Sequence, residues 1–359
     1  MRIGIIGGGQ LGKMIIMEGR KLDLEFLVID AMKDSPAGKI ADRSFQYDDY
    51  VEFVRESDVI TFEFEHVNDA VLEAAERSGK LVPGINAIML KRDRAREKQF
   101  LKGIGVPTAP FFVTEDKEDL RKAVDHFPMS VVKSAYGGYD GKGQYRISRG
   151  ESLDRIPDGK YVVEEKIDFD YEASIIALGC RDGGVKFYSP SYNLNEKGIL
   201  LLNRAPIDAE VLSGIAGKII RELKYVGAMG IEFFMVNGKP MVNEIAPRVH
   251  NTGHHTLLGS SLSQFEAHLR AICNLPLENP MTFAPSGIVN LIGRGMDRPL
   301  MSRILEVENT VIYWYGKEEV RKGRKMGHVN LVADSEEKLR KNMESVLEIY
   351  YGKNREKFL

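Results

Sequence analysis

Two glutamates stand on the two strands of a predicted β-hairpin, with Asn237-Gly238 at its turn. A three-residue loop, 237–239, places Glu232 directly across from Glu244 on one face of the hairpin. A two-residue Asn-Gly loop instead pairs Glu232 with Asn243 and sends the two acids to opposite faces. Opposed like charges destabilise a sheet unless a cation neutralises them. Because Mg²⁺ prefers oxygen ligands and attached phosphates, the first register predicts a magnesium site, and the alternative is two exposed glutamates.

A glycine-rich loop follows an apolar strand in the first half of the chain. The strand 131–132 leads into Lys133, and the stretch 137–143 holds four glycines around Lys142. Glycines let the backbone approach a polyphosphate closely, and lysines supply charge. The pattern GxxxxGK[ST] is missing, so this is not a P-loop. The prediction is a phosphate-binding loop, and the alternative is a loose glycine turn with two solvated lysines.

The next strand, 160–167, passes from apolar residues into charged ones. Such a segment can bind adenine through its backbone N–H and C=O groups. Glu172 follows closely and can accept hydrogen bonds from ribose hydroxyls. The alternative for each glutamate of this region is a solvated strand position.

Two cationic segments follow the hairpin. Arg248 and His250 lie in a rigid Pro/Gly stretch, 246–256, beside the predicted metal site, which suits an anionic acceptor such as bicarbonate. Clustered histidines also suggest zinc, although their spacing fits no standard helical ligand pattern. Further on, residues 313–328 concentrate cations among glycines and aromatics. That segment predicts a phosphate-binding loop, with a solvated charge run as the alternative.

The N-terminal turn Gly7–Gly12 satisfies GxGxxG, and Asp30 lies near the distance of a ribose-binding acid. The pattern is typical of NAD or FAD binding. Any phosphorylated ligand can occupy such a helix N-terminus, however, so the motif alone does not select a dinucleotide.

The elements that position these residues change in character along the chain. Strands at 2–6, 25–30 and 58–62 alternate with helices at 10–21 and 67–78, which indicates a doubly wound parallel sheet. A small α+β unit follows the prolines near residue 107, and longer antiparallel strands with helices at 208–224 and 261–273 come after it. Strands at 286–293, 310–316 and 327–332 and a helix at 335–350 complete the chain.

Composition is that of a globular protein of two or three domains. The chain has 359 residues, 43% hydrophobic residues and a net charge of −2, which gives no basis for nucleic-acid or anionic-membrane binding. Its two cysteines, Cys180 and Cys273, are expected to be buried, inert thiols in a reducing compartment. Neither a signal peptide nor an apolar run of about 18 residues is evident, so a cytoplasmic protein is expected.

Taken together, the motifs resemble the N5-carboxyaminoimidazole ribonucleotide synthetase family of the ATP-grasp superfamily. The resemblance runs from Gly7 to His328 and rests on GGGQLGKM, TFEFEHV, KSAYGGYDGKGQ, NEIAPRVHNTGHHT and YGKEEVRKGRKMGHV, in that order. It implies an α/β and α+β ATP-grasp fold, usually in a homodimer. The expected units are a Rossmann-like substrate domain (1–95), an ATP-grasp lid (96–168) and a central catalytic domain with a C-terminal subdomain (169–359).

The resemblance also implies roles for individual residues. Mg²⁺, or Mn²⁺, would lie on Glu232 and Glu244, and Arg248, His250 and Tyr139 would serve the chemistry, the first two by orienting bicarbonate. The imidazole ribonucleotide would contact Gln10, Leu11, Glu63 and Tyr139, with its phosphate on Lys317 and Arg324. ATP would be held by Arg94, Lys133, Gly138, Asp140, Gly141, Lys142, Gly143, Gln144, Glu164, Glu165, Lys166, Ile167, Glu172, Tyr192, Asn243 and Glu244.

The implied reaction is ATP-dependent carboxylation of 5-aminoimidazole ribonucleotide through carboxyphosphate, or CO₂ released from it, in purine biosynthesis. Two departures from the family pattern are Tyr192, where some members carry histidine, and His255, where many carry tryptophan. One rival is the formate-dependent glycinamide ribonucleotide transformylase, which lacks the GGYDGKGQ and GRKMGH motifs. The other is an NAD-dependent oxidoreductase built on Gly7–Gly12.

Overall fold

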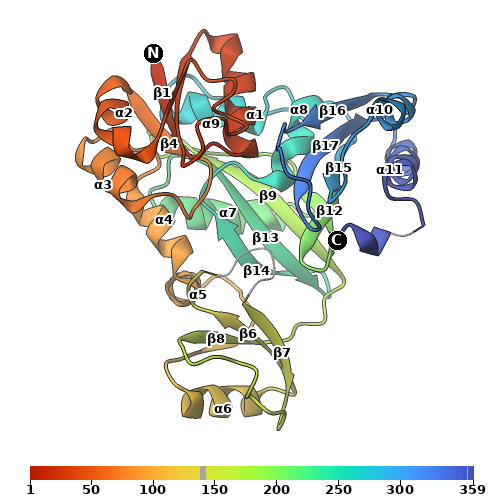
Figure 1. Ribbon diagram of the computed structural model, residues 1–359. Coiled ribbons are helices and arrows are strands. Elements are labelled where there is room, and N and C mark those ends of the chain that lie inside the picture. Colours follow the sequence, from red (N-terminus) through yellow and green to blue (C-terminus); the bar gives the residue numbers. More distant parts are fainter. Residues whose placement is uncertain (138–142, 354) are drawn as a thin grey trace.

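The computed structural model describes residues 1–137, 143–353 and 355–359. Three β-sheets organise the chain, and Figure 1 shows them as the N-terminal, lower and central parts of the molecule. The positions 138–142 of the predicted phosphate loop lie outside the described residues.

The N-terminal part is a four-stranded parallel sheet with the strand order β3-β2-β1-β4. Its strands β1, β2 and β4 are short, largely apolar and mostly buried, as expected for a parallel sheet between helices. Beyond β4, Leu81 adds a single parallel bridge to Ile60. The elements are β1 (Arg2–Ile6), α1 (Gln10–Gly19), η1 (Arg20–Leu22), β2 (Glu25–Ile29), β3 (Arg43–Phe45), η2 (Tyr47–Asp49), α2 (Tyr50–Glu56), β4 (Val59–Phe62), α3 (Asp69–Arg77) and α4 (Ile85–Arg92).

The lower part is a small antiparallel sheet with the order β5-β8-β6-β7. Helix α6 covers it through Leu120 and Val124, which join Val132, Ile147 and Val163 in one apolar cluster. The elements are β5 (Phe111–Thr114), α6 (Lys117–His126), β6 (Met129–Ser134), β7 (Gln144–Ser148) and β8 (Tyr161–Glu165).

The central part is a nine-stranded antiparallel sheet with the order β14-β13-β9-β11-β12-β15-β17-β16, and β10 pairs with β9. The segments predicted at 286–293, 310–316 and 327–332 therefore extend the same sheet that carries the hairpin. Its elements are β9 (Tyr171–Gly179), β10 (Val185–Phe187), β11 (Ser191–Glu196), β12 (Ile199–Ala205), α7 (Val211–Glu222), β13 (Gly227–Val236), β14 (Lys239–Ala246), η3 (Asn251–His255), α8 (Thr256–Gly259), α9 (Gln264–Ile272), β15 (Ser286–Ile292), α10 (Arg298–Leu305), β16 (Thr310–Trp314), β17 (Lys325–Val332), α11 (Glu336–Tyr351) and η4 (Arg355–Lys357).

Helix α5 (Arg94–Gly103) ties the three parts together, and the sequence analysis missed it. Asp93 caps its N-terminus by accepting from the N–H groups of Ala95 and Arg96. The Arg94 N–H donates to the carbonyl of Ala135 in the lower part. The Glu97 carboxylate accepts from the N–H of Ile245 in the hairpin at 2.8 Å. A single helix thus fixes the small sheet relative to the large one.

The hairpin β13–β14 has a two-residue loop, so the three-residue loop considered from sequence is wrong. Val236 pairs with Lys239, and Asn237 and Gly238 have φ of 50° and 73°, as a type I′ turn requires. A β-bulge after Glu232 nevertheless leaves Asn243 unpaired and sets Glu232 opposite Glu244. The extra residue shifts the pairing by one position and brings both acids to the same face. The predicted opposition is confirmed, although a bulge produces it and not the loop length.

Two sequence expectations concern the molecule as a whole. Within the described parts of the chain, every helix is too short or too polar to cross a lipid bilayer. Cys180 and Cys273 are free thiols, but both are half-buried, so the expectation that they are buried was too strong. Burial raises the pKa of the Cys273 thiol to about 11, which keeps it protonated and unreactive at neutral pH.

Two glycine substitutions test the turn assignment with opposite expected signs. Gly238→Ala forces a Cβ onto a residue with positive φ and should lower the free energy of unfolding by about 1 kcal/mol. Gly214→Ala lies within helix α7 and should raise it by up to about 1 kcal/mol. At both sites an added Cβ meets no described atom within 4 Å, so only backbone conformation differs. Urea unfolding measures both, and two changes of the same sign would contradict the type I′ turn.

Candidate active site

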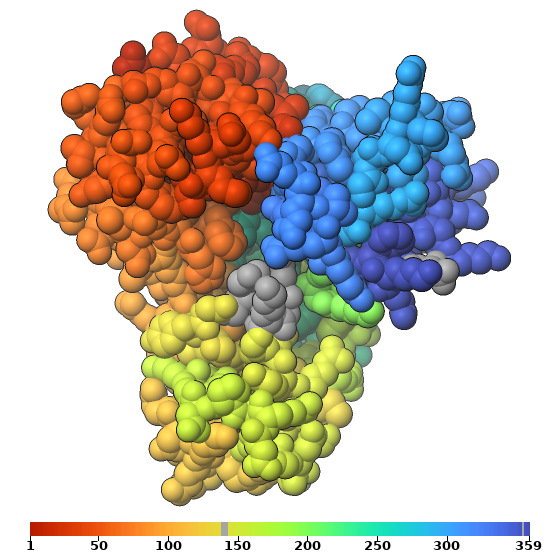
Figure 2. Space-filling view, viewed as in Figure 1, coloured from red at the N-terminus to blue at the C-terminus, as the bar shows by residue number. Residues whose placement is uncertain are grey.

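A cleft of about 910 Å³ lies where the three parts of the molecule meet. Figure 2 shows the N-terminal residues (red to orange) and the C-terminal residues (blue) side by side above the lower part (yellow). Most of the predicted site residues that the structure describes line this cleft. They are Gln10, Leu11, Glu63, Arg94, Lys133, Gln144, Glu164, Glu165, Lys166, Ile167, Glu172, Glu232, Asn243, Glu244, Arg248, His250 and Lys317.

The remaining predicted residues fall into two groups. Gly138, Tyr139, Asp140, Gly141 and Lys142 lie outside the described residues. Gly143, Tyr192 and Arg324 are described but are not among the cleft-lining residues. The Arg324 guanidinium instead donates to Glu319, a contact at the surface beside the basic loop.

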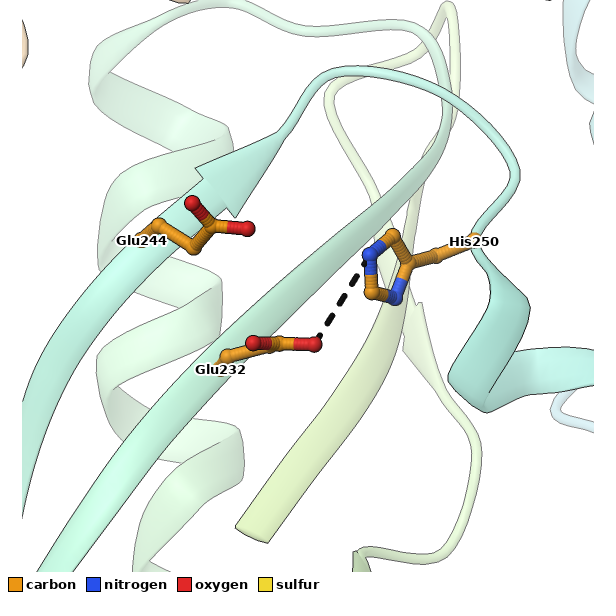
Figure 3. A group of neighbouring side chains, drawn as sticks. All are labelled: Glu232, Glu244 and His250. Carbon is orange, nitrogen blue, oxygen red and sulfur yellow. Dashed lines mark ion pairs between the residues drawn. The ribbon is translucent and has the colours of Figure 1, made fainter. Parts of the chain in front are cut away.

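Glu232 and Glu244 converge at the floor of the cleft. Figure 3 shows them on adjacent strands with His250 approaching from the segment that follows β14. One ligand atom from each of the three side chains lies within 4.8 Å of the other two. Burial first, and then the charges of Glu244 and Glu172, raise the pKa of Glu232 above its ordinary value. This donor set of carboxylate oxygens fits a hard divalent cation such as Mg²⁺.

Lys91 stabilises the second glutamate of the pair. Its ammonium lies 3.2 Å from the Glu244 carboxylate and 3.3 Å from that of Glu97. Burial is the largest single influence and opposes ionisation of Glu244, but the charge and hydrogen bond of Lys91, together with other nearby groups that include Arg94, outweigh it, so the pKa of Glu244 falls below its ordinary value. The two opposed acids therefore differ in protonation, with Glu244 ionised and Glu232 holding its proton more tightly.

His250 is a neutral imidazole. Burial and the charge of Arg248 lower the pKa of His250 to about 3. The Nδ1 atom lies 2.9 Å from the Thr252 hydroxyl and accepts from the Thr252 N–H, which leaves the proton on Nε2, 3.8 Å from Glu232. That tautomer makes His250 a hydrogen-bond donor into the cleft and a poor metal ligand.

The zinc hypothesis from the histidine-rich segment finds no support among the described residues. The Nδ1 of His254 contacts Gln264, and the Nδ1 of His255 contacts the Ser286 hydroxyl. Both rings are buried away from Glu232 and Glu244, and only His250 belongs to the described cluster of potential ligands.

Arg248 is held next to this cluster by an acid that the sequence analysis did not assign. Its guanidinium lies 3.0 Å from the carboxylate of Glu65, and both side chains are largely buried. The amide of Asn251 lines the cleft close by, is 7% exposed and has no hydrogen-bond partner among the described residues. A fixed guanidinium, a neutral N–H donor and an unpaired amide together form a site for a small planar anion.

The adenine expectation concerns the segment after β8. The Glu165 and Lys166 N–H groups already donate to Pro110 and Met129 in the backbone, whereas the Ile167 N–H donates to no other described atom. Phe169 and Phe234 stack at 4.6 Å and line the same end of the cleft. An open N–H beside an aromatic wall suits a purine ring. Glu172, bonded to Asn195 at 2.7 Å, lies next to it.

The N-terminal glycine turn is occupied by an acid of the protein itself. The Glu63 carboxylate accepts from the N–H groups of Gly9, Leu11 and Gly12 at 2.9, 3.1 and 3.3 Å. Asp30 accepts from the Gly8 N–H at 2.7 Å. A dinucleotide pyrophosphate would need the helix N-terminus that Glu63 fills, so the turn lacks an open anion site. This geometry disfavours the NAD alternative.

The basic C-terminal segment meets helix α1 across the cleft. Lys317 donates to the Gln10 side chain at 2.8 Å. Lys13 donates to the carbonyls of Trp314 and Tyr315 at 3.0 and 3.2 Å and fixes the loop against α1. Two segments three hundred residues apart thereby form one wall, which is what the predicted ribonucleotide site requires.

Tyr192 points away from the nucleotide end of the cleft, so its assignment to ATP is corrected. On β11, Tyr192 pairs with Ala173 and Arg204. The next residue, Asn193, pairs with Glu172, so the side chains of Tyr192 and Asn193 lie on opposite faces of the sheet. The Tyr192 ring lies under the Arg204 guanidinium and beside Tyr171. Asn195, two residues beyond Asn193, lines the cleft and donates to Glu172. The sequence motif around Tyr192 thus located strand β11 but did not predict which of its side chains face the cleft.

Comparison with protein families divides the chain into three matching regions. Residues 1–91 match a ribonucleotide synthetase preATP-grasp domain, residues 99–265 an ATP-grasp domain, and residues 286–342 a phosphoribosylaminoimidazole carboxylase C-terminal domain.

Individual relatives match along the whole chain. The chain is 48% identical to the N5-carboxyaminoimidazole ribonucleotide synthase of Saccharolobus solfataricus, over 98% of this chain and 96% of that protein. The crystal structure of the Thermus thermophilus synthetase has a TM-score of 0.88 at 34% identity, covering 97% and 98% of the two chains. An Aspergillus clavatus synthase, crystallised with ADP and 5-aminoimidazole ribonucleotide, has a TM-score of 0.87 at 27% identity, covering 97% and 98%. The chain belongs to the N5-carboxyaminoimidazole ribonucleotide synthase family of ATP-grasp ligases.

Proposed function

We propose that this chain uses MgATP to join bicarbonate to the exocyclic amine of 5-aminoimidazole ribonucleotide, giving N5-carboxyaminoimidazole ribonucleotide, ADP and phosphate. Family membership and the ATP-grasp domain support the reaction class. The observation that carries the proposal is the opposed pair Glu232 and Glu244 beside the Arg248–Asn251 anion site. A metal-bound triphosphate and a small planar anion would meet at that point of the cleft.

The chain's own side chains would act by positioning and charge. Arg94 and Lys133 would hold the phosphates, and Glu232 and Glu244 would hold Mg²⁺, which supplies charge neutralisation at the transferred phosphoryl group. Arg248 would hold bicarbonate, and the Nε2–H of neutral His250 would donate to it. None of these residues needs to form a covalent bond to a substrate.

The bond changes follow from that arrangement. A bicarbonate oxygen attacks the terminal phosphorus of ATP, and the bond to ADP breaks. The substrate amine then attacks the carboxyl carbon, directly or after CO₂ is released, while phosphate leaves and the amine proton departs with it. The enclosed cleft limits hydrolysis of carboxyphosphate, because it keeps bulk water away from the intermediate.

Gln10, Leu11 and Lys317 would bind the ribonucleotide. Glu63 would act mainly by holding the glycine turn, because its carboxylate already accepts from three backbone N–H groups. Arg324 would reach the substrate phosphate only by leaving Glu319. The roles of Tyr139 and of the loop Gly138–Lys142 are proposed from the family resemblance alone.

Several wider expectations remain part of this proposal. They are the division into units 1–95, 96–168 and 169–359, the use of Mg²⁺ or Mn²⁺, a homodimer, and a cytoplasmic location.

A substrate comparison tests the proposed reaction. With ATP, Mg²⁺ and bicarbonate, 5-aminoimidazole ribonucleotide should stimulate ADP release, measured by a coupled spectrophotometric assay. Glycinamide ribonucleotide with formate should give no stimulation above the background. Stimulation by the second pair alone would assign the chain to the transformylase, and tight NADH binding without ATP binding would favour the oxidoreductase.

Neutral isosteres test the metal ligands. Glu244→Gln should lower substrate-stimulated ADP formation by about two orders of magnitude or more, because the loss of one ligand charge weakens metal-assisted charge neutralisation by several kcal/mol. Glu222→Gln, at the exposed end of α7, is the matched control and should leave the rate unchanged. Full activity in Glu244→Gln would refute the metal assignment.

The raised pKa of Glu232 gives a pH prediction for metal binding. Below its pKa of about 8 this carboxyl holds a proton, which a metal ion must displace. Mn²⁺ affinity, measured by electron paramagnetic resonance without nucleotide, should therefore rise with pH by up to about tenfold per unit and level off above that pKa. Glu232→Gln should bind weakly and lose this dependence. A pH-independent affinity in the parent protein would contradict the assignment.

A further inference from the structure

Three buried charges meet where helix α5 packs against the small sheet. The Glu164 Oε2 atom lies 2.9 Å from the Lys133 ammonium and 3.4 Å from the Lys98 ammonium. The side chains of Lys98 and Glu164 are 2% and 3% exposed. Lys133 and Glu164 line the cleft, whereas Lys98 lies behind them. The arrangement holds two cations and one anion, so its net charge is +1.

The hydrogen bonding of this triad is incomplete. The Lys98 Nζ makes no hydrogen bond to any described residue, and the Glu164 Oε1 atom accepts none. Lys133 donates to the Glu164 Oε2 atom and is therefore the cation that mainly compensates this carboxylate. A buried cation without a full partner is costly, and a second lysine is unnecessary if the only purpose is to neutralise Glu164. An anion that draws Lys133 away would leave Glu164 and Lys98 as a matched pair.

We propose that Lys98 is a positioning residue that retains the Glu164 carboxylate when Lys133 moves to the nucleotide phosphates. The inference rests on the proposed function, because it takes the incoming anion to be MgATP or MgADP. Without Lys98, Lys133 is the one lysine that the structure describes beside the Glu164 carboxylate, and Arg94, the other cation that acts on this carboxyl, is itself expected to bind phosphate. Moving Lys133 to phosphate then leaves the buried carboxylate poorly compensated. Lys98 removes that cost without touching the nucleotide.

Variants that change the net charge of Lys98, Lys133 and Glu164 distinguish the proposed role of Lys98 from a role in packing alone. Lys98→Met brings the triad to zero net charge and leaves Lys133 tied to Glu164. Adding Glu164→Gln to that variant restores +1 and releases Lys133. If Lys98 only supports packing, the second substitution adds further damage; if Lys98 acts as proposed, it restores binding.

Calorimetric titration with MgADP measures the effect. Lys98→Met should weaken MgADP binding by about tenfold, as expected for one charge-assisted hydrogen bond. Lys98→Met/Glu164→Gln should bind MgADP several-fold more tightly than Lys98→Met, because Lys133 is released, and Lys98→Arg should stay within about threefold of the parent. Lys102→Met, one turn further along α5 and exposed, is the matched control and should bind like the parent.

The outcomes distinguish the two levels of the argument. A parent protein that does not bind MgADP refutes the proposed function itself. A parent that binds, with Lys98→Met unchanged or the double variant weaker than Lys98→Met, overturns the role of Lys98. Should Lys98→Met not fold, a crystal structure of the parent with MgADP decides: Lys133 must lie on phosphate and Lys98 nearer to Glu164 than 3.4 Å. Lys133 still on Glu164 overturns the proposal.

Discussion

The mutual repulsion of Glu232 and Glu244 is the constraint around which the cleft is organised. A tight Asn-Gly turn and one bulged residue bring two carboxylates onto the same face of a hairpin, directly opposite one another. That placement costs free energy in the protein alone, since like charges face each other in a partly desolvated site. Lys91 offsets the cost on one side and proton retention offsets it on the other. A divalent cation would relieve both at once.

The same design recurs along the cleft, where the charges expected to bind ligand already have partners within the protein. Glu244 has Lys91, Arg248 has Glu65, and Lys133 has Glu164. Ligand binding then exchanges one ion pair for another. Without these partners the buried groups would have to stay charged with no counter-charge, which is too costly for the protein. Two of these partners, Lys91 and Glu65, come from α4 and from the loop after β4, so the segments that join the sheets also set the electrostatics of the site.

The sequence predicted what local chemistry determines. The first strand and helix and the existence of the β13–β14 hairpin follow from turn residues and hydrophobic periodicity. The favoured loop length was wrong, because the opposition of the two acids comes from a bulge and not from a three-residue loop. The bulge at Asn243 was beyond reach, because an unpaired residue in a strand leaves no mark in the pattern of side chains. Helix α5 was missed because Glu97 and Lys98 occupy positions of its buried stripe where apolar residues are expected. Charges at those positions were the available signal, since a buried charge needs a specific partner. Tyr192 shows what a motif cannot predict. A motif can locate a strand, but an error of one position along it places a side chain on the opposite face of the sheet.

The most direct test of this account is a crystal structure of the Mn²⁺–ADP complex with anomalous scattering data that locate the metal. The account predicts one manganese peak bonded to carboxylate oxygens of both Glu232 and Glu244, at roughly 2.0–2.3 Å, with the Lys91 ammonium no longer closest to Glu244. A metal held by the nucleotide alone, with the two glutamates left as they are without ligand, would contradict it.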